Sequence, residues 1–250
     1  RYMPFRPPVP EEILTVANHL LGKGQPSLAK YLLIACYEDA PQLSTHDIPG
    51  YFQHVLSRID LSRDLHFQTR TTIDTLDYSG DGWNAGSKLV IAARGPVIRK
   101  LGSELPQNIT LPLSCKSIDL IMPGVIAVSF RPFSDYTQAK IEIDDLIHSL
   151  ATHNLEPWPL WILTEDSQWM SRELNNFLWA TFTRSQPAKD VYGVSATFID
   201  KHWSCKAPII IDARIKPHHA PELETDPEVS KKVDQMFAKG GILHGKIKGL

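Results

Sequence analysis

Four segments of the chain have apolar residues three and four positions apart, which is the spacing of an amphipathic helix. They cover residues 13–21, 48–56, 143–151 and 174–182. Pro49 suits a first helical turn, where its missing N–H is not needed. The pattern therefore predicts a helix over each segment.

Short, continuously apolar runs lie between these helices, at residues 32–36, 89–93, 125–130, 160–163 and 209–211. Strands that are apolar on both faces are typical of parallel sheets covered by helices on each side. Alternating strands and helices favour right-handed β-α-β units. We therefore predict an α/β protein with layered α/β/α architecture and mostly parallel sheets.

The same order of features occurs twice along the chain. An apolar strand ends in an acidic pair, an amphipathic helix and an aspartate follow, and a lysine and an arginine then flank a second strand. The first series is Glu38, Asp39, Asp64, Lys88 and Arg94, and the second is Glu165, Asp166, Asp190, Lys206 and Arg214. Self-similarity on this scale predicts two duplicated β-α-β modules.

The duplication sets the expected domain boundaries. We expect a first α/β module in residues 1–102 that lacks its opening strand, a second module in 103–238, and a flexible basic tail in 239–250. Residues 101–122 lack periodicity and separate the modules. In the second module we expect strands near 124–130, 159–164, 191–197 and 207–212, and helices at 138–152 and 171–184. Whether the modules share one sheet stays open.

Composition narrows the function classes. In 250 residues, 42% are hydrophobic and 22% charged, with a formal net charge of -2, so no broad basic field exists for nucleic acid. No apolar run is long enough to predict a membrane span. Three separated cysteines fit a reducing, cytoplasmic setting better than a disulfide framework. The start at Arg1 leads us to expect a piece of a longer protein.

The acidic pairs Glu38-Asp39 and Glu165-Asp166 end predicted strands. The carboxyl ends of strands face the ligand crevice in open α/β sheets, so these acids are candidate metal ligands or general bases. Alternatively they cap the following loop or helix. We favour capping, because one crevice seldom needs both copies of a catalytic pair.

Lys88 and Lys206 precede a predicted strand, and Arg94 and Arg214 follow it. A lysine and an arginine that converged on a crevice would bind phosphate or carboxylate. The alternative is that these charges form ion pairs or lie at solvated strand ends. A small-anion binding module is therefore a second functional hypothesis, beside the one that follows from the family resemblance below.

Two further residue types bear on function. His202, His218, His219 and Asp212 lie close in the sequence but lack the spacing of a zinc protease, so a metal-dependent hydrolase is the least favoured hypothesis. The six tryptophans favour cores and contacts between protein chains. We expect Trp179 to face a helix or a partner subunit, and its replacement by alanine would cost roughly 3–5 kcal/mol if the indole is buried.

An ordered set of motifs occupies the second half of the chain. An apolar strand ends in Glu165-Asp166, a helix carries Leu-Trp-Ala at 178–180 and ends in Thr183-Arg184, and Pro187 precedes Asp190. Lys206 then leads to Ile-Asp-Ala at 211–213, and Asp-Pro-Glu-Val at 226–229 opens a terminal helix. In this order the motifs resemble the C-terminal domain of the UbiD family of decarboxylases. The resemblance covers residues 118–238, and the first half matches more loosely. Ser204-Cys205 departs from the family's Gly-Ser before its lysine, which Gly86-Ser87-Lys88 keeps.

The resemblance implies the following expectations. Such enzymes decarboxylate aromatic or α,β-unsaturated acids with prenylated flavin mononucleotide and a divalent metal, held in a domain upstream of this one. We find no match to that domain, so we expect no cofactor and no catalytic residue in this chain. The chain would then be an oligomerisation and active-site-closing region, inactive alone, with the upstream flavin domain and further copies of itself as partners.

Overall fold

The computed structural model describes residues 9–220 and 225–246 and has an α/β fold, as predicted. The helices are α1 (Leu14–Leu21), α2 (Ile48–Leu56), α3 (Tyr136–Leu150), α4 (Ser167–Arg172), α5 (Leu174–Thr183), α6 (Pro187–Asp190) and α7 (Pro227–Phe237), with 3-10 turns at Pro10–Ile13, Gln25–Leu28 and Tyr37–Asp39. The strands are β1 (Tyr31–Ala35), β2 (Leu65–Thr71), β3 (Gly86–Ala93), β4 (Cys115–Met122), β5 (Val125–Phe130), β6 (Leu160–Thr164), β7 (Val191–Ile199) and β8 (His202–Asp212).

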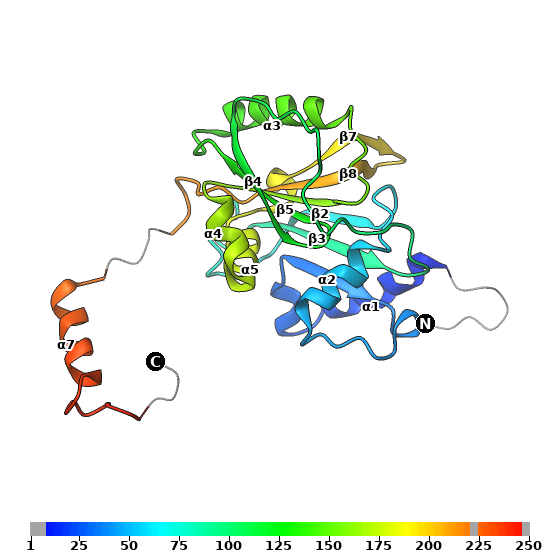
Figure 1. Cartoon of the computed structure of the whole chain (residues 1–250). Coiled ribbons are helices and arrows are strands. Elements are labelled where there is room, and N and C mark those ends of the chain that lie inside the picture. The colour runs from blue at the N-terminus through cyan, green and yellow to red at the C-terminus, as the bar shows by residue number, and fades with distance from the viewer. Residues whose placement is uncertain (1–8, 221–224, 247–250) are drawn as a thin grey trace. The chain divides into compact units, whose positions relative to one another are not determined.

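The strands form two separate sheets, so the two halves do not share one (Figure 1). Their orders are β1-β3-β2 and β4-β5-β6-β8-β7. Three of the six strand pairs are antiparallel, so the prediction of mostly parallel sheets is wrong. One reason is the tight return from β7 to β8 at Asp200 and Lys201, which both have positive φ, as a hairpin turn requires. Apolar runs do not reveal strand direction.

Two strands were missed and one helix was misjudged. β4 lies within residues 101–122, where the sequence shows no periodicity, and β2 was not predicted. Both lie at sheet edges and are largely half-exposed, so neither has the continuous apolar run of a buried strand. The helix expected at 171–184 is two helices, α4 and α5, because Glu173 between them is extended.

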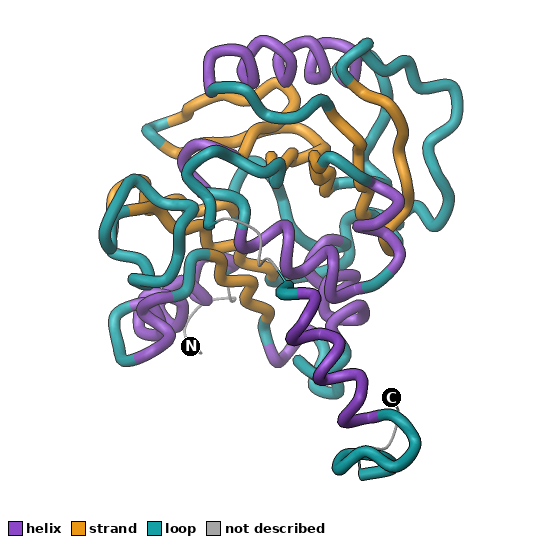
Figure 2. The backbone as a smooth tube through the Cα atoms, turned by 90° about the vertical axis from the view of Figure 1, so that its left-hand side faces the viewer, coloured by secondary structure: helices purple, strands orange, loops and turns teal. Residues whose placement is uncertain are grey.

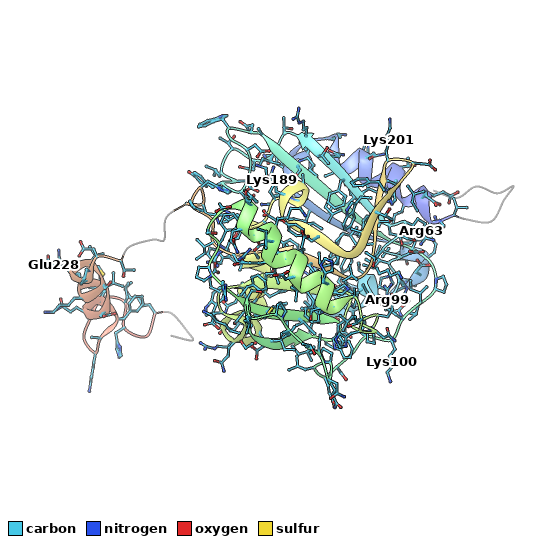
Figure 3. The ribbon with its side chains drawn as sticks, turned by 90° about the horizontal axis from the view of Figure 1, so that it is seen from above. Arg63, Arg99, Lys100, Lys189, Lys201 and Glu228 are labelled. Carbon is cyan, nitrogen blue, oxygen red and sulfur yellow. The ribbon has the colours of Figure 1, made fainter. Side chains whose placement is uncertain are left out.

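Three apolar cores hold the sheets and helices together. α3 packs on the outer face of the five-stranded sheet, and α1 on the outer face of the three-stranded sheet (Figures 1 and 2). The inner faces of both sheets share one core with α2, α4 and α5. Alternate residues of β3 divide between cores: Leu89 and Ile91 face inward, and Val90 faces α1. Figure 3 looks down on α3, with Lys189 of α6 labelled near one of its ends.

The two sheets contain the same three-strand arrangement. β3 lies between its parallel neighbour β1 and its antiparallel neighbour β2, and β8 lies in the same way between β6 and β7. The pairing begins alike in both sheets, with Tyr31 opposite Leu89 and Leu160 opposite Ile209. Leu89 and Ile209 therefore hold matching positions.

Residues 220–250 form a unit separate from the rest of the chain. Within it, α7 confirms the predicted terminal helix, and Asp226 caps it by accepting hydrogen bonds from the N–H groups of Glu228 and Val229. The predicted flexible tail lies partly outside the described residues. Its described part folds back on α7, where Leu243 N–H donates to the Met236 carbonyl oxygen at 2.9 Å.

Candidate functional site

Two of the four candidate acids bind backbone at the carboxyl ends of the sheets. Asp39 Oδ2 accepts a hydrogen bond from Gly95 N–H at 2.6 Å, and Glu165 Oε1 accepts one from Ile215 N–H at 2.7 Å. Gly95 follows Arg94 after the end of β3, and Ile215 follows Arg214 after the end of β8. These carboxylates therefore tie one strand end to the next in both sheets.

The other two acids make local contacts. Asp166 caps α4 by accepting a hydrogen bond from Trp169 N–H at 2.8 Å. Glu38 is exposed and accepts one from the Cys36 thiol at 2.7 Å. The geometry of Asp166 thus fits the capping interpretation, whereas Asp39 and Glu165 tie distant strand ends together. A catalytic role for the acids stays a prediction.

The two candidate lysines differ in environment. Lys88 is buried, and its Nζ donates to the carbonyl oxygens of Ser27 at 2.8 Å and Ala29 at 3.0 Å. Lys206 is exposed. In the antiparallel pairings, Lys88 lies opposite Gln68 of β2 and Lys206 lies opposite Val194 of β7. The two lysines therefore match, although a register shift between Gly193 and Val194 places two extra residues of β8 between Lys206 and Ile209.

The two candidate arginines hold matching positions and make matching contacts. Arg94 Nη1 lies 3.1 Å from Glu12 Oε2, and Arg214 Nη1 lies 3.0 Å from Glu142 Oε2. Each glutamate comes from the helical segment on the outer face of its sheet. The arginines thus form ion pairs within the fold, which was the alternative to an anion site.

The lysine and arginine of one strand do not converge on one ligand. Lys88 and Arg94 are six residues apart along β3, which corresponds to roughly 20 Å in an extended chain. They therefore lie at opposite ends of the strand. Lys206 and Arg214 are similarly separated along β8.

Asp64 and Asp190 also hold matching positions. Asp64 Oδ2 accepts a hydrogen bond from Asp60 N–H at 2.8 Å, and Asp190 Oδ2 accepts one from Gln186 N–H at 2.6 Å. Each aspartate closes the turn immediately before an antiparallel strand. Within the described residues, neither aspartate forms an ion pair with Arg94 or Arg214.

The densest group of charges is what we call the buried charge cluster: Glu142, Asp190, Asp212, Arg214 and Lys216. Arg214 is fully buried and binds Asp212 with two hydrogen bonds of 2.9 and 2.8 Å. Lys216 Nζ lies 3.4 Å from Asp190 Oδ1 and donates to the Asp212 carbonyl oxygen at 2.9 Å.

The sequence analysis missed Glu142 and Lys216 in this cluster. One signal was available for Glu142, which lies on the apolar stripe of its helix beside Ala139 and Ile143. A charge on the buried stripe of a helix requires a buried partner. Nothing comparable marked Lys216, whose burial depends on the path of the chain after β8.

Burial and pairing act on the two buried aspartates with different results. Burial raises the pKa of Asp190 to about 6 despite the nearby Lys216. Burial also acts to raise the pKa of Asp212, but Lys216 and Arg214 outweigh it and hold that pKa below its ordinary value. Asp212 receives two charge-assisted hydrogen bonds from Arg214, whereas Asp190 receives a backbone hydrogen bond from Gln186 and a long ion pair with Lys216, so the difference follows from their contacts.

Asp190 and His219 should make opposite contributions to the pH dependence of stability. Burial lowers the pKa of His219 to about 4, with Lys216 and His218 adding to the effect. The folded state binds fewer protons at His219 than the unfolded state, so its contribution rises with pH from about 4 to about 6.5. The raised pKa of Asp190 means that its contribution falls as pH rises from about 4 to about 6.

We therefore expect His219→Gln to lose stability relative to the parent as pH rises through this window. Asp190→Asn should show the reverse trend. Urea unfolding at pH 4.5, 5.5 and 6.5 measures both differences. Differences that stay constant with pH in both variants would contradict the assignment.

The residues of the metal hypothesis do not gather into one site. Asp212 is held by Arg214, and His219 Nδ1 accepts a hydrogen bond from Lys216 N–H at 3.2 Å. The His202 ring lies 5.3 Å from that of His66. Within 9–220 and 225–246, no three His, Cys, Asp or Glu side chains are placed to hold a metal ion.

Two open hollows lie in the described structure, one beside α2 and one beside β1. The larger, about 820 Å³, is lined by Asp39, His54, Arg58 and Lys100 among others. The smaller, about 410 Å³, lies beside β1 and is lined by aromatic side chains and by Lys30, whose Nζ is paired with Asp77 at 2.8 Å. The charges of both signs in each hollow give neither the character of a simple anion site.

One protein family matches most of the first half of the chain. Residues 5–93 match the family described as 3-octaprenyl-4-hydroxybenzoate carboxy-lyase C-terminal domain, or UbiD_C. This stretch of the chain is therefore similar to a UbiD-type C-terminal domain. The resemblance seen in the sequence is thus confirmed, although this UbiD match lies in the half that we had judged the looser one.

Longer relatives match almost the whole chain. A Chlamydia pneumoniae protein, whose name describes it as part of a 4-hydroxybenzoate decarboxylase, is 31% identical over 232 residues, which are 90% of this chain and 36% of that protein. An uncharacterized protein of Chlamydia caviae is 32% identical over 232 residues, 91% of this chain and 36% of its own length. The chain therefore spans little more than a third of the length of these relatives.

Two further structural findings concern the described residues. No helix in the described part of the chain is long and apolar enough to cross a membrane. The described cysteines, Cys36, Cys115 and Cys205, are all free thiols.

Proposed function

We propose that the chain is an oligomerisation and active-site-closing region of a UbiD-like decarboxylase acting on aromatic or α,β-unsaturated carboxylic acids. The observation that carries this proposal is the match of residues 5–93 to the carboxy-lyase C-terminal domain. The name of the Chlamydia pneumoniae relative supports an aromatic acid such as 4-hydroxybenzoate as substrate. Carbon–carbon bond cleavage would then belong to other parts of a longer enzyme.

In this proposal, prenylated flavin mononucleotide and a divalent metal bind to an upstream domain. The flavin supplies the covalent chemistry when bound, and residues of this chain contribute by shaping and closing the crevice. Closure excludes water from a charged reaction intermediate and completes the site around the substrate. The charge pairing of Arg94 and Arg214 within the fold supports a scaffold role.

Duplication is the second part of the proposal. We infer that the two halves derive from one module, and three matching features support this. The three-strand arrangements agree, Asp64 and Asp190 close equivalent turns, and Arg94 and Arg214 pair with glutamates on the outer helical segments. The free thiols support a reducing, cytoplasmic location.

The alternative is a small-anion module that uses Lys88, Arg94, Lys206 and Arg214. It is less favoured, because the first, second and fourth of these side chains already bind groups within the protein. Thermal unfolding with phosphate or 4-hydroxybenzoate tests it. A rise in melting temperature that Lys206→Ala abolishes would support the anion module over the scaffold.

The main test is an activity assay. The chain, purified and supplied with prenylated flavin mononucleotide and Mn²⁺, should release no CO2 from 4-hydroxybenzoate, whereas the longer enzyme that contains it should. Replacing this region in the longer enzyme by a flexible linker should reduce turnover at least tenfold. Full turnover by the isolated chain, or by the enzyme without this region, would overturn the proposal.

A further inference from the structure

The larger of the two hollows lies along one side of α2. Residues from the helix and from the turn after it line this hollow, among them Gly50, His54, Ser57 and Arg58. The segment that follows β3 also lines it, through Val97, Lys100, Leu101 and Ser103. Its volume of about 820 Å³ is in the range of sites that hold small molecules.

Backbone hydrogen bonds fix the segment after β3 beside the end of α2. The N–H groups of Ile98 and Arg99 both donate to the Ser57 carbonyl oxygen, at 2.9 and 3.2 Å. Lys100 is the next residue, and Arg58 follows Ser57 directly. The hydrogen bonds therefore bring two cations, Arg58 and Lys100, to the same end of the hollow.

Arg58 lacks the carboxylate partner that comparable arginines have. Arg63 and Arg214 each bind an aspartate through Nε and Nη2. Within the described chain Arg58 uses only Nη1, which donates to the His54 carbonyl oxygen and to Ser57 Oγ, both at 3.2 Å, and its buried Nε has no partner. Every other buried or half-buried arginine in residues 9–220 and 225–246 pairs with an aspartate or a glutamate.

Charges of both signs line the hollow, but its two acids already bind backbone groups. Asp39 Oδ2 accepts a hydrogen bond from Gly95 N–H at 2.6 Å, and Asp47 Oδ1 accepts one from Gly50 N–H at 3.1 Å. Asp47 precedes α2 and Arg58 follows it, so the nine-residue helix separates their backbones by roughly 14 Å. The hollow thus offers unpaired cations at one end, and each carboxylate keeps a second oxygen that can accept hydrogen bonds.

His54 lines the hollow from the middle of this helix face. It is only 7% exposed, and its Nε2 has no hydrogen-bond partner in the part of the chain that the structure describes. Burial lowers the pKa of His54, Arg58 adds to this effect and Asp39 opposes it, so the ring is neutral at pH 7. A buried polar atom without a partner calls for a further polar group beside it, such as one on a bound molecule.

We propose that this hollow binds a small hydroxylated molecule that carries a phosphate or carboxylate group, which Arg58 and Lys100 hold. The planar guanidinium of an arginine suits both groups, and Lys100 adds a second positive charge that forms no ion pair among the described residues. Hydroxyl groups suit the rest of the hollow, because the carboxylates there can accept hydrogen bonds from them. The inference rests on the hollow itself and does not depend on the proposed decarboxylase function.

NMR titration of the full, isotope-labelled chain tests the site with three matched probes. Glucose 6-phosphate and gluconate carry a phosphate and a carboxylate on similar hydroxylated chains, and glucose carries no charge. At least one of the two anions should shift the amide signals of Ser57 and Lys100 with a Kd below about 1 mM, and comparing the two tells phosphate from carboxylate. Glucose should leave these signals unchanged, and the amide of Ile162 in β6 should not respond to any probe.

Three variants assign the binding to the hollow. Arg58→Gln should weaken it by about tenfold or more, because it removes charge-assisted hydrogen bonds. Lys100→Ala should weaken it roughly two- to fivefold, because this cation is exposed, and it remains informative if Arg58→Gln unfolds the protein. Arg172→Gln removes an exposed arginine elsewhere and should bind like the parent.

Three results would overturn the proposal. The first is the absence of shifts at Ser57 and Lys100 with both anions at about 10 mM, a concentration well above the expected Kd. The second is an equal response to glucose, which would show that the charged group is not recognised. The third is an unchanged affinity in Lys100→Ala and in folded Arg58→Gln.

Discussion

Replacing Arg214 with methionine is expected to lower the free energy of unfolding by about 3–5 kcal/mol. Arg214 is fully buried and binds both Asp212 and Glu142 through charge-assisted hydrogen bonds. Methionine would fill much of the same volume but would leave two carboxylates without their cation. Removing one partner of a buried ion pair costs far more than the intact pair contributes, because the remaining charge stays in a region of low polarity.

Urea unfolding at pH 7 measures this loss, and Arg94→Met is the matched control. Arg94 holds the equivalent position but is 11% exposed and has one carboxylate partner, so its replacement should cost less. Arg172→Met, at an exposed position, controls for the loss of one positive charge. Equal losses of unfolding free energy for Arg214→Met and Arg172→Met would show that the buried charge cluster does not stabilise the fold.

The second large effect is expected at Trp161, whose replacement by alanine should cost about 3–5 kcal/mol. Trp161 is fully buried in β6, in the core under α3. The loss combines the transfer of apolar surface to water with the cavity that the indole would leave. Thermal or urea unfolding of the variant measures it.

Trp179→Ala is the matched control for Trp161→Ala. We expected Trp179 to face a helix or a partner subunit; within this chain its side chain is 54% exposed, and the Arg184 guanidinium lies 4.8 Å from the centre of its ring. Its replacement should therefore cost less than about 1 kcal/mol, the scale of an exposed cation–π contact. A loss at Trp179 as large as that at Trp161 would mean that the α5 face is covered in solution, for example by a second copy of the chain.

Helix periodicity did not distinguish these two tryptophans, for a physical reason. The stripe of α5 that contains Phe177 and Ala180 is buried, and Phe182 packs against Tyr31 with ring centroids 5.0 Å apart. Trp179 lies between stripe positions on the helix. An indole is large enough to be stable on the surface when a cation covers it, so residue type alone does not decide burial.

The positions of the candidate site residues were predicted from the sequence, but their partners were not. The pattern located the carboxyl ends of the predicted strands to within about one residue, and the acids and arginines do lie beyond those ends. It placed the starts of β3 and β8 too late, so Lys88 and Lys206 lie within these strands rather than before them. Whether Arg94 and Arg214 were free to bind an anion depended on Glu12 and Glu142, which come from distant helical segments. A spacing rule within one strand contains no information about such partners.

The sequence by itself determined the α/β class, the predicted strands near residues 32, 90, 127, 161 and 210, and the resemblance to the UbiD C-terminal region. These follow from local periodicity and short motifs, which act over a few residues. Only the tertiary structure decided strand direction, the edge strands β2 and β4, and the pairing of the buried charges. These depend on contacts between residues far apart in the chain, and such contacts leave no regular pattern in the sequence.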